Sequence, residues 1–327
     1  MKGLFDKGSL SSAVFCVALG LGAPVVHAAE SISPAGPIGG TDIRSALLPP
    51  PGNYGAAVAG GIDLTGWYTA DDWLPATGNV EFGGLGWLHV YDLDVLGGRL
   101  ASSIFVGVQE TCFGLTEATK RCAQGLRDTY SDIFVWSKFV PSADFASQPP
   151  APIPIPYGTA FLVGFGMNFP TGAYNAEQGI NIGSNFYTFS PNIGITHTTK
   201  SWLGPTFGDA TEFSARMFFN FYTENTETNY KTGPVISLDF ALTERKGPLQ
   251  YGLTGTGFRQ ISDDTLFGVA VGNNGNRASA LNIGPLVAYD FFVDQRPFNI
   301  MFKGLFTVWG ENNTESMGLT VRLVTKL

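Results

Sequence analysis

Hydrophobic and polar positions alternate with a period of two between residues 211 and 223. One column is almost purely apolar and consists of Phe213, Ala215, Met217, Phe219 and Phe221. The interleaved column is mixed and consists of Glu212, Ser214, Arg216, Phe218, Asn220 and Tyr222. Successive side chains of a β-strand point to opposite faces. The pattern therefore predicts a strand whose two faces meet different environments.

Similar alternation recurs in the second half of the chain, most clearly in residues 236–242, 297–309 and 315–326. Twelve candidate strands follow from such patterns and from turn residues. They lie at 54–68, 81–92, 98–109, 130–141, 157–170, 185–199, 211–223, 232–242, 249–262, 279–291, 297–309 and 315–326. Most reach the roughly 9–11 residues that a tilted transmembrane strand needs, whereas soluble strands usually have about 5–6 residues.

The polar columns decide between a soluble sandwich and a membrane barrel. A sandwich exposes its polar face to bulk water, but these columns carry few charges, together with Gly, Thr, Asn and aromatic residues. Charged residues make up only 14% of the chain, and after residue 28 no apolar run approaches the roughly 20 residues of a spanning helix. The sequence therefore predicts an all-β fold: a transmembrane antiparallel β-barrel of outer-membrane type, with about 12 strands, over residues 54–327.

The lengths of the connections give a second indication. With both termini in the periplasm, even-numbered connections should be short turns and odd-numbered ones long external loops. The connections at 243–248 and 292–296 are compact, whereas 110–129, 171–184 and 263–278 are longer and polar. Residues 142–156 break the rule, because this proline-rich stretch falls where a short turn is expected. It is either a long periplasmic excursion or a sign that the early strands are miscounted by one.

The N-terminus resembles a secretory signal. Lys2 and Lys7 precede an apolar run, and Val26 and Ala28 suit signal peptidase, so residues 1–28 are predicted to be removed. The expected location is the Gram-negative outer membrane. Loss of this segment changes the formal charge from −8 to −9, and an acidic chain is unsuited to nucleic acid. Residues 29–53 are rich in Gly and Pro and form either a hatch in the lumen or a periplasmic tail.

Candidate chemistry is sparse. Cys112 and Cys122 close a small loop in an oxidising compartment and are predicted to form a structural disulfide. No metal or cofactor site is expected, because the ligand spacings are missing. A lipid hydrolase is a weak alternative, since His197 has no G-x-S-x-G motif to accompany it. The acidic pairs at 71–72 and 263–264 fall in external loops, where they either bind divalent cations that bridge lipopolysaccharide or are simply solvated.

Several short motifs occur in order over most of the mature chain. They are PPPGNY (49–54), NFPTGAYN (168–175), NIGSNFYTFSPNIGITHT (181–198), FNFYTENTETNYKTG (219–233), GFRQISDD (257–264), GNNGN (272–276) and ALNIGPLVAYDF (280–291). Together they resemble a known family, the outer-membrane transporters of the phenol meta-degradation pathway, which includes sphingosine-induced porins. The resemblance implies an outer-membrane barrel that admits hydrophobic compounds. The C-terminus is also similar to a signal for the barrel-assembly machinery, although it ends in Leu327 rather than an aromatic residue.

These observations predict a channel for passive or facilitated uptake of small hydrophobic or aromatic solutes, in contact with outer-membrane lipid and lipopolysaccharide. Inward aromatic side chains would stack on a solute, and charged ones would orient it. The predicted luminal path consists of Asp132, Phe134, Trp136, Lys138, Glu212, Arg216, Phe218, Tyr222, Asp239 and Lys303. Two alternatives stay open: luminal charges that serve only to pair with one another, and a barrel that is a closed structural or surface-interaction protein.

Overall fold

The computed structural model describes residues 34–148, 151, 153–272 and 275–327, so the predicted signal peptide lies outside the described residues. Twelve long strands form the wall of a barrel. They are β1 (Gly52–Tyr68), β2 (Trp73–Val95), β3 (Gly98–Gly114), β5 (Thr129–Pro141), β6 (Gly158–Phe169), β7 (Thr188–Lys200), β8 (Ala210–Tyr222), β10 (Val235–Lys246), β11 (Leu249–Gln260), β14 (Ser279–Val293), β15 (Arg296–Glu311) and β16 (Asn313–Lys326).

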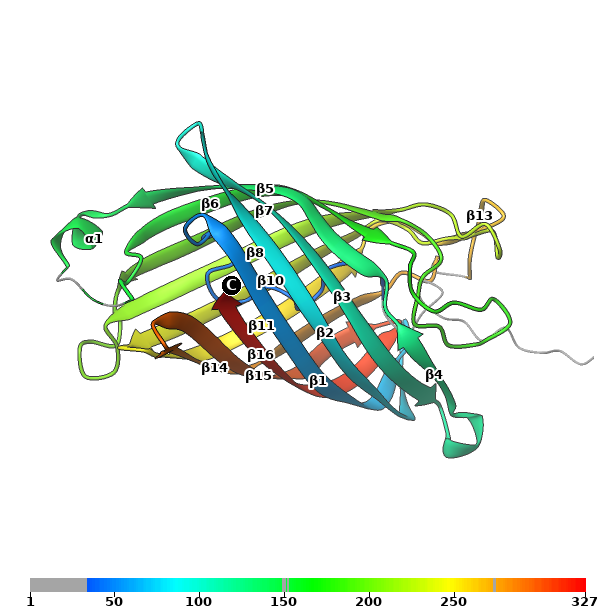
Figure 1. The fold of residues 1–327 in the computed structure, drawn as a ribbon. Coiled ribbons are helices and arrows are strands. Elements are labelled where there is room, and N and C mark those ends of the chain that lie inside the picture. Colours follow the sequence, from blue (N-terminus) through cyan, green and yellow to red (C-terminus); the bar gives the residue numbers. More distant parts are fainter. Residues whose placement is uncertain (1–33, 149–150, 152, 273–274) are drawn as a thin grey trace, which may run out of the picture.

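Each wall strand pairs antiparallel with its sequence neighbours, and the first strand closes on the last (Figure 1). In the closing seam, β1 and β16 pair from Tyr54 opposite Lys326 to Tyr68 opposite Asn313. This closure leaves no free edge along the wall, as a lipid environment requires. The predicted all-β barrel of twelve strands is therefore confirmed.

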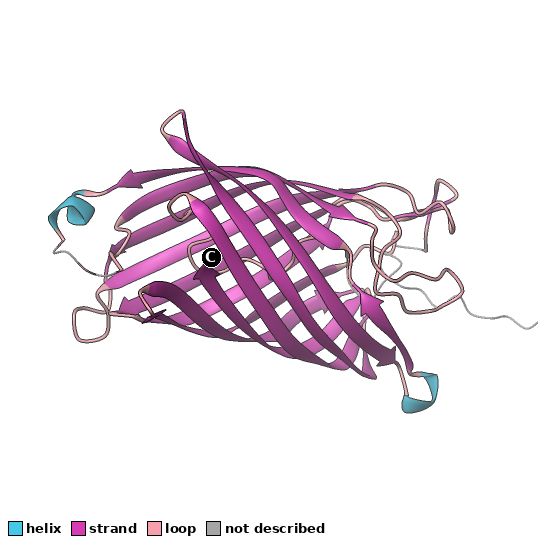
Figure 2. Cartoon of the chain, in the orientation of Figure 1, coloured by secondary structure: helices cyan, strands magenta, loops and turns pink. Residues whose placement is uncertain are grey.

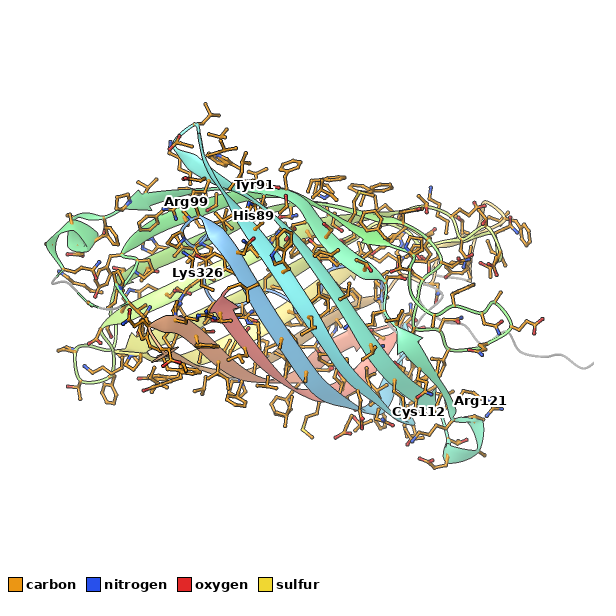
Figure 3. All side chains as sticks on the ribbon, in the orientation of Figure 1. His89, Tyr91, Arg99, Cys112, Arg121 and Lys326 are labelled. Atoms are coloured by element: carbon orange, nitrogen blue, oxygen red, sulfur yellow. A yellow bond between two sulfur atoms is a disulfide. The ribbon has the colours of Figure 1, made fainter. Side chains whose placement is uncertain are left out.

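Strand β8 shows why the sequence folds this way. Phe213 and Phe221 are 40% and 47% exposed on the outer face, whereas Phe218 on the inner face is only 1% exposed. Other strands repeat the pattern, so large apolar side chains cover the outside of the barrel (Figure 3). An apolar outer band and a polar interior are the arrangement that a bilayer favours.

The connections differ from the predicted alternation at several places. The end that carries the C-terminus holds the tight turns at 96–97, 247–248 and 294–295, but also the long connection 142–157. This connection contains the short helix α1 (Ala143–Ser147), so it is a true excursion and the strands were not miscounted. The opposite end holds long connections at 170–187, 223–234 and 261–278, and by the barrel rule it is extracellular.

Two external connections are shorter than predicted. Residues 69–72 join β1 to β2, and Asn312 alone joins β15 to β16. Asn312 has a φ of 45°, a left-handed conformation that Asn tolerates in tight turns. A third predicted loop, 110–129, is largely a hairpin, because β3 continues to Gly114 and pairs with β4 (Arg121–Leu126) across η2 (Glu117–Thr119).

Small elements complete the external end. Strands β9 (Tyr230–Lys231), β12 (Thr265–Leu266) and β13 (Val269–Ala270) form a second sheet that joins two of the loops. In the part of the chain that the structure describes, helical structure is confined to short pieces at the two ends of the barrel (Figure 2). Within the described residues, no helix combines the length and apolar character needed to cross a membrane.

Candidate functional site: the barrel lumen

Seven of the predicted luminal side chains point inward and are nearly inaccessible to solvent. They are Asp132, Glu212, Arg216, Phe218, Tyr222, Asp239 and Lys303. Because β8 and β10 pair with Arg216 opposite Asp239, these two charges lie on neighbouring strands of the same wall.

The other three residues do not reach the lumen. A bulge at Ile133 interrupts the pairing of β5 with β6 between Asp132 and Phe134. One extra residue in a strand moves every following side chain to the opposite face. Phe134 therefore points outward, 47% exposed and stacked on Phe165. The expectation that Trp136 and Lys138 share a face with Asp132 fails for the same reason.

The displaced pair instead supports the neighbouring turn. Trp136 donates its Nε1–H to the carbonyl oxygen of Val95 at 2.7 Å, and Lys138 donates from Nζ to that of Leu96 at 3.1 Å. Both acceptors belong to the β2–β3 hairpin, which projects beyond the barrel rim (Figure 1). Trp136 and Lys138 therefore stabilise the β2–β3 turn at the rim and lie outside the luminal path.

One luminal network connects wall strands to each other. Arg216 donates from Nη2 to Asp132 at 2.7 Å and from Nε to Asn192 at 3.0 Å. The same guanidinium lies over the ring of Phe218, 4.8 Å from its centroid. The Tyr130 hydroxyl donates to the same oxygen of Asp132 that accepts from Arg216. Cation–π contacts of this kind strengthen when they are desolvated. The network therefore braces β5, β7 and β8, which lie on one side of the wall.

A chain segment occupies the lumen alongside these side chains. Residues 34–51, called the luminal segment below, lead from the start of β1 back into the barrel, where Figure 1 draws them in dark blue. At the external end, Tyr222 donates its hydroxyl to the carbonyl of Ala35 at 2.9 Å. At the opposite end, Ser137 donates to the carbonyl of Ala46 at 2.5 Å. The segment thus follows the length of the lumen.

Asp239 attaches the segment to the wall through three hydrogen bonds. Its carboxylate accepts hydrogen bonds from the Gly39 N–H at 2.7 Å and from the N–H and hydroxyl of Thr41, both at 2.9 Å. Thr256 of the wall donates a fourth bond at 2.7 Å. Bonds to an ionised acceptor are about twice as strong as neutral ones. A carboxylate that is only 1% exposed therefore has its hydrogen-bonding capacity filled mainly by the segment.

Asp42 of the segment carries a negative charge into a cationic part of the wall. Lys303 donates to Asp42 at 2.9 Å, and Arg322 lies at a longer 3.4 Å. Thr254 adds a hydroxyl bond at 3.2 Å. Lys303 also donates to the Gly39 carbonyl at 2.6 Å, so one wall lysine holds two parts of the segment.

Arg44 makes the reciprocal contact with an acidic part of the wall. Its Nη2 lies 2.8 Å from Asp290 and 3.1 Å from the side-chain oxygen of Gln250, and its N–H donates to Glu212 at 2.8 Å. Asp290 is shared with Arg245 of the wall at 3.1 Å. Opposite charges two residues apart in the segment thus fix its register against one continuous part of the wall, the neighbouring strands from β8 to β16.

Apolar contacts separate these polar attachments. Ala35 and Ile38 pack on an external cluster of wall residues that includes Phe186, Tyr222 and Phe258. Ile43 packs in the middle, with Leu286 and Met301 among its neighbours. A third cluster gathers around Ala46 and comprises Ala46, Val90, Ala101, Val135, Ala160 and Leu162. The lumen is therefore amphipathic along its whole described length.

Sequence reasoning missed the partners that the segment contributes. Asp42 and Arg44 lie in a Gly- and Pro-rich stretch with no periodicity, and their partners Asp290 and Arg322 are remote in the sequence. The only available signal was the alternation of the predicted strands, because it places Arg322 and Asp290 at inward positions.

The remaining candidates lie outside the lumen. Cys112 and Cys122 form the predicted disulfide, which links β3 to β4 in the external hairpin (Figure 3). His197 points outward, and its hydrogen-bond partner among the described residues is the Thr159 hydroxyl at 2.9 Å. No carboxylate orients this imidazole in the described part of the chain, so it lacks the arrangement of a hydrolytic triad.

The wall sequence matches a family model over residues 69–323, and the description of that family reads "Putative MetA-pathway of phenol degradation". The chain belongs to this family. The match begins just after β1 and extends into β16, so it covers nearly all of the wall but not the luminal segment. No curated protein matches the sequence significantly.

Solved structures share the fold. An outer membrane channel from Pseudomonas putida F1 superposes with a TM-score of 0.68 at 13% identity, covering 86% of this chain and 97% of that one. The translocator domain of the autotransporter NalP from Neisseria meningitidis has a TM-score of 0.41 at 11% identity, covering 86% and 91%. The CymD monoaromatic hydrocarbon channel has a TM-score of 0.32 at 9% identity, covering 93% and 98%. The first likeness establishes the fold, and the other two are too distant to support an argument.

Proposed function

We propose that this family member is a channel of the Gram-negative outer membrane that admits small hydrophobic or aromatic compounds by passive or facilitated diffusion. The observation that carries the proposal is the content of the lumen. Within the described residues, the luminal segment occupies it without regular secondary structure, and separate hydrogen bonds to wall side chains hold the segment. A barrel built only for rigidity would fill its interior with wall side chains, as small barrels do.

The amphipathic lumen suits solutes of mixed character. Apolar clusters lie at both ends of the segment's path, and polar groups lie between them. When the segment shifts, Phe218 and Tyr222 offer ring faces to a solute, and the adjacent Arg216 and Asp132 orient its polar end. The remaining inward residues of the predicted path, Glu212, Asp239 and Lys303, act on the segment and so control its position.

An open cavity at the external end provides an entrance. It has a volume of about 760 Å³ and is lined by residues that include Arg259, Arg277 and Glu311. Ala278 lines this cavity and also belongs to the external apolar cluster, so the cavity adjoins that cluster. A solute that enters here meets apolar wall before it meets the charged attachments of the segment.

The outer surface supports contact with lipid. On β2, Trp87 and Tyr91 are 44% and 37% exposed on either side of His89, which they contact at centroid distances of 5.8 and 4.7 Å (Figure 3). Aromatic residues of this kind favour the membrane interface. Contacts with lipopolysaccharide and with the barrel-assembly machinery belong to the same proposal, and no catalytic role is assigned.

Purified protein in planar bilayers and in liposomes tests the proposal. We expect measurable conductance and uptake of a small aromatic alcohol, and we expect deletion of residues 34–48 to raise both. The matched control is deletion of residues 143–147 in the excursion between β5 and β6, which leaves the lumen unchanged. Absence of conductance and uptake in both the full-length and the 34–48 deletion proteins would refute a channel.

That negative result would favour the second candidate, a closed structural or surface-interaction barrel. The observation on its side is the number of hydrogen bonds that fasten the segment, at Asp239, Asp42 and Arg44 together. Such a protein would act through its external loops and would leave growth on hydrophobic substrates unchanged when deleted.

A further inference from the structure

A second cavity lies inside the lumen, between the luminal segment and the wall. Its volume is about 260 Å³, below the roughly 300–1,000 Å³ of sites for drug-sized ligands. The segment contributes residues 40–45 and Pro49, and strands β1, β2 and β16 contribute Tyr54, Leu88, Arg322 and Val324. A compound with one small ring fits a space of this size.

The wall side of the cavity is apolar. Leu88 and Tyr54 belong to the apolar cluster that surrounds Ala46, and Val324 lies one inward position from Arg322 on β16. Burying hydrocarbon against such a surface is favourable, at about 25 cal/mol per Å² of apolar area. The cavity therefore selects a ligand whose larger part is hydrocarbon.

Arg322 introduces a positive charge that its neighbours satisfy poorly. Its Nη1 reaches Asp42 only at 3.4 Å, and its Nη2 donates to the sulfur of Met301, a weak acceptor, at 3.4 Å. Its Nε is buried and has no hydrogen-bond partner among the described residues. Asp42 is meanwhile held more closely by Lys303, at 2.9 Å. A guanidinium with only 18% of its side chain exposed thus lacks the bidentate carboxylate that its geometry favours.

The segment adds further donors to the same cavity. Arg44 and Ser45 both line it, and the Arg44 Nε and the Ser45 hydroxyl are buried without partners among the described residues. Unsatisfied buried donors cost about 1–3 kcal/mol each. An acceptor in the cavity therefore lies beside residues with unsatisfied donors on both the wall and the segment.

We propose that this cavity binds a small hydrophobic molecule that carries one carboxylate. Arg322 holds the carboxylate, and Leu88, Tyr54 and Val324 contact the hydrocarbon. The proposal deepens the proposed function, because it names a substrate class for the same lumen. Since the ligand competes with Asp42 for Arg322, binding also loosens one attachment of the luminal segment.

Calorimetric titration of the full-length protein in detergent micelles tests this site. Benzoate is the probe, and benzyl alcohol is its neutral counterpart with the same ring. We expect benzoate to bind at least tenfold more tightly than benzyl alcohol. Arg322→Met should lower benzoate affinity at least tenfold and leave benzyl alcohol unchanged, whereas Arg322→Lys should retain part of the preference.

Lys326→Met is the matched control, because Lys326 is the next inward cation on β16 but does not line the cavity. It should change benzoate affinity less than twofold. Equal binding of the two probes to the wild type, no binding of benzoate, or unchanged affinity in Arg322→Met would each overturn the proposal. Conductance measured on the same samples separates the two failures, because a conducting protein without benzoate selectivity refutes only this site.

Discussion

Asp239→Asn is the most direct perturbation of the luminal segment. The substitution keeps the size of the side chain but removes its charge and replaces one acceptor oxygen by a donor amide. Three of the four bonds that Asp239 accepts come from Gly39 and Thr41 of the segment. The variant should therefore release residues 39–44 from the wall more often.

The size of the effect follows from these contacts. Hydrogen bonds to a charged group contribute roughly 1.5–3 kcal/mol, and neutral ones about 0.5–1.5 kcal/mol. A loss of about 1 kcal/mol at each of three bonds gives about 3 kcal/mol, which is roughly a hundredfold in the opening equilibrium. Amide hydrogen exchange read by mass spectrometry measures this equilibrium directly, since local opening sets the exchange rate.

Asp132→Asn provides the control. Asp132 is a buried carboxylate of the same lumen, but its partners Arg216, Tyr130 and Ser103 all belong to the wall. This variant should leave exchange at residues 39–44 within a few-fold of the wild type. The reasoning is refuted if Asp239→Asn leaves that exchange unchanged, or if both variants accelerate it equally.

Three further predictions concern the rest of the molecule. The Cys112–Cys122 disulfide stabilises the external hairpin by roughly 2–3 kcal/mol through loop entropy. Its reduction should therefore increase tryptic cleavage in this hairpin and leave conductance unchanged. Loss of the folded barrel on reduction would contradict a local role. The Gly247 N–H is the main group that lowers the pKa of Asp209, and the Lys246 ammonium adds to the effect. The ionised Asp209 carboxylate therefore stabilises the folded protein fully above the ordinary carboxyl pKa of about 4. This stabilisation is lost as the pH falls through the lower pKa of the folded state. Asp209→Asn should flatten the acid limb of a pH–stability curve, and an unchanged limb would exclude this group as a cause. Phe134→Arg should lower stability in urea titrations of vesicle-inserted protein by about 2–4 kcal/mol, as expected for a charge facing lipid, and wild-type stability would place Phe134 away from the bilayer.

The wall could be predicted from the sequence because alternation is a local signal. In β8, adjacent residues lie on opposite faces of the strand, so their polarity indicates which face meets lipid and which meets the lumen. The resemblance to a known family pointed to the same fold. The same alternation predicts the inward positions of Arg216 and Lys303.

The interior could not be predicted to the same extent. The bulge at Ile133 reverses the inward–outward alternation, and no residue type in this stretch signals it. The alternation alone therefore predicts the wrong face for Phe134. The pairing of Asp42 with Lys303 joins residues that are 261 positions apart, and no periodicity connects them. A segment without regular structure takes its position entirely from the partners that the closed wall offers.

The luminal segment also separates the two ends of the described chain. β1 and β16 are neighbours in the wall, yet Ala35 reaches the external end, while the Leu327 N–H bonds to Asn53 at the opposite rim. Labels attached at residues 35 and 327 would therefore report on opposite sides of the membrane. It also follows that the wall encloses a length of its own polypeptide, so the segment must either be in place before the seam between β1 and β16 closes or enter through an open end afterwards.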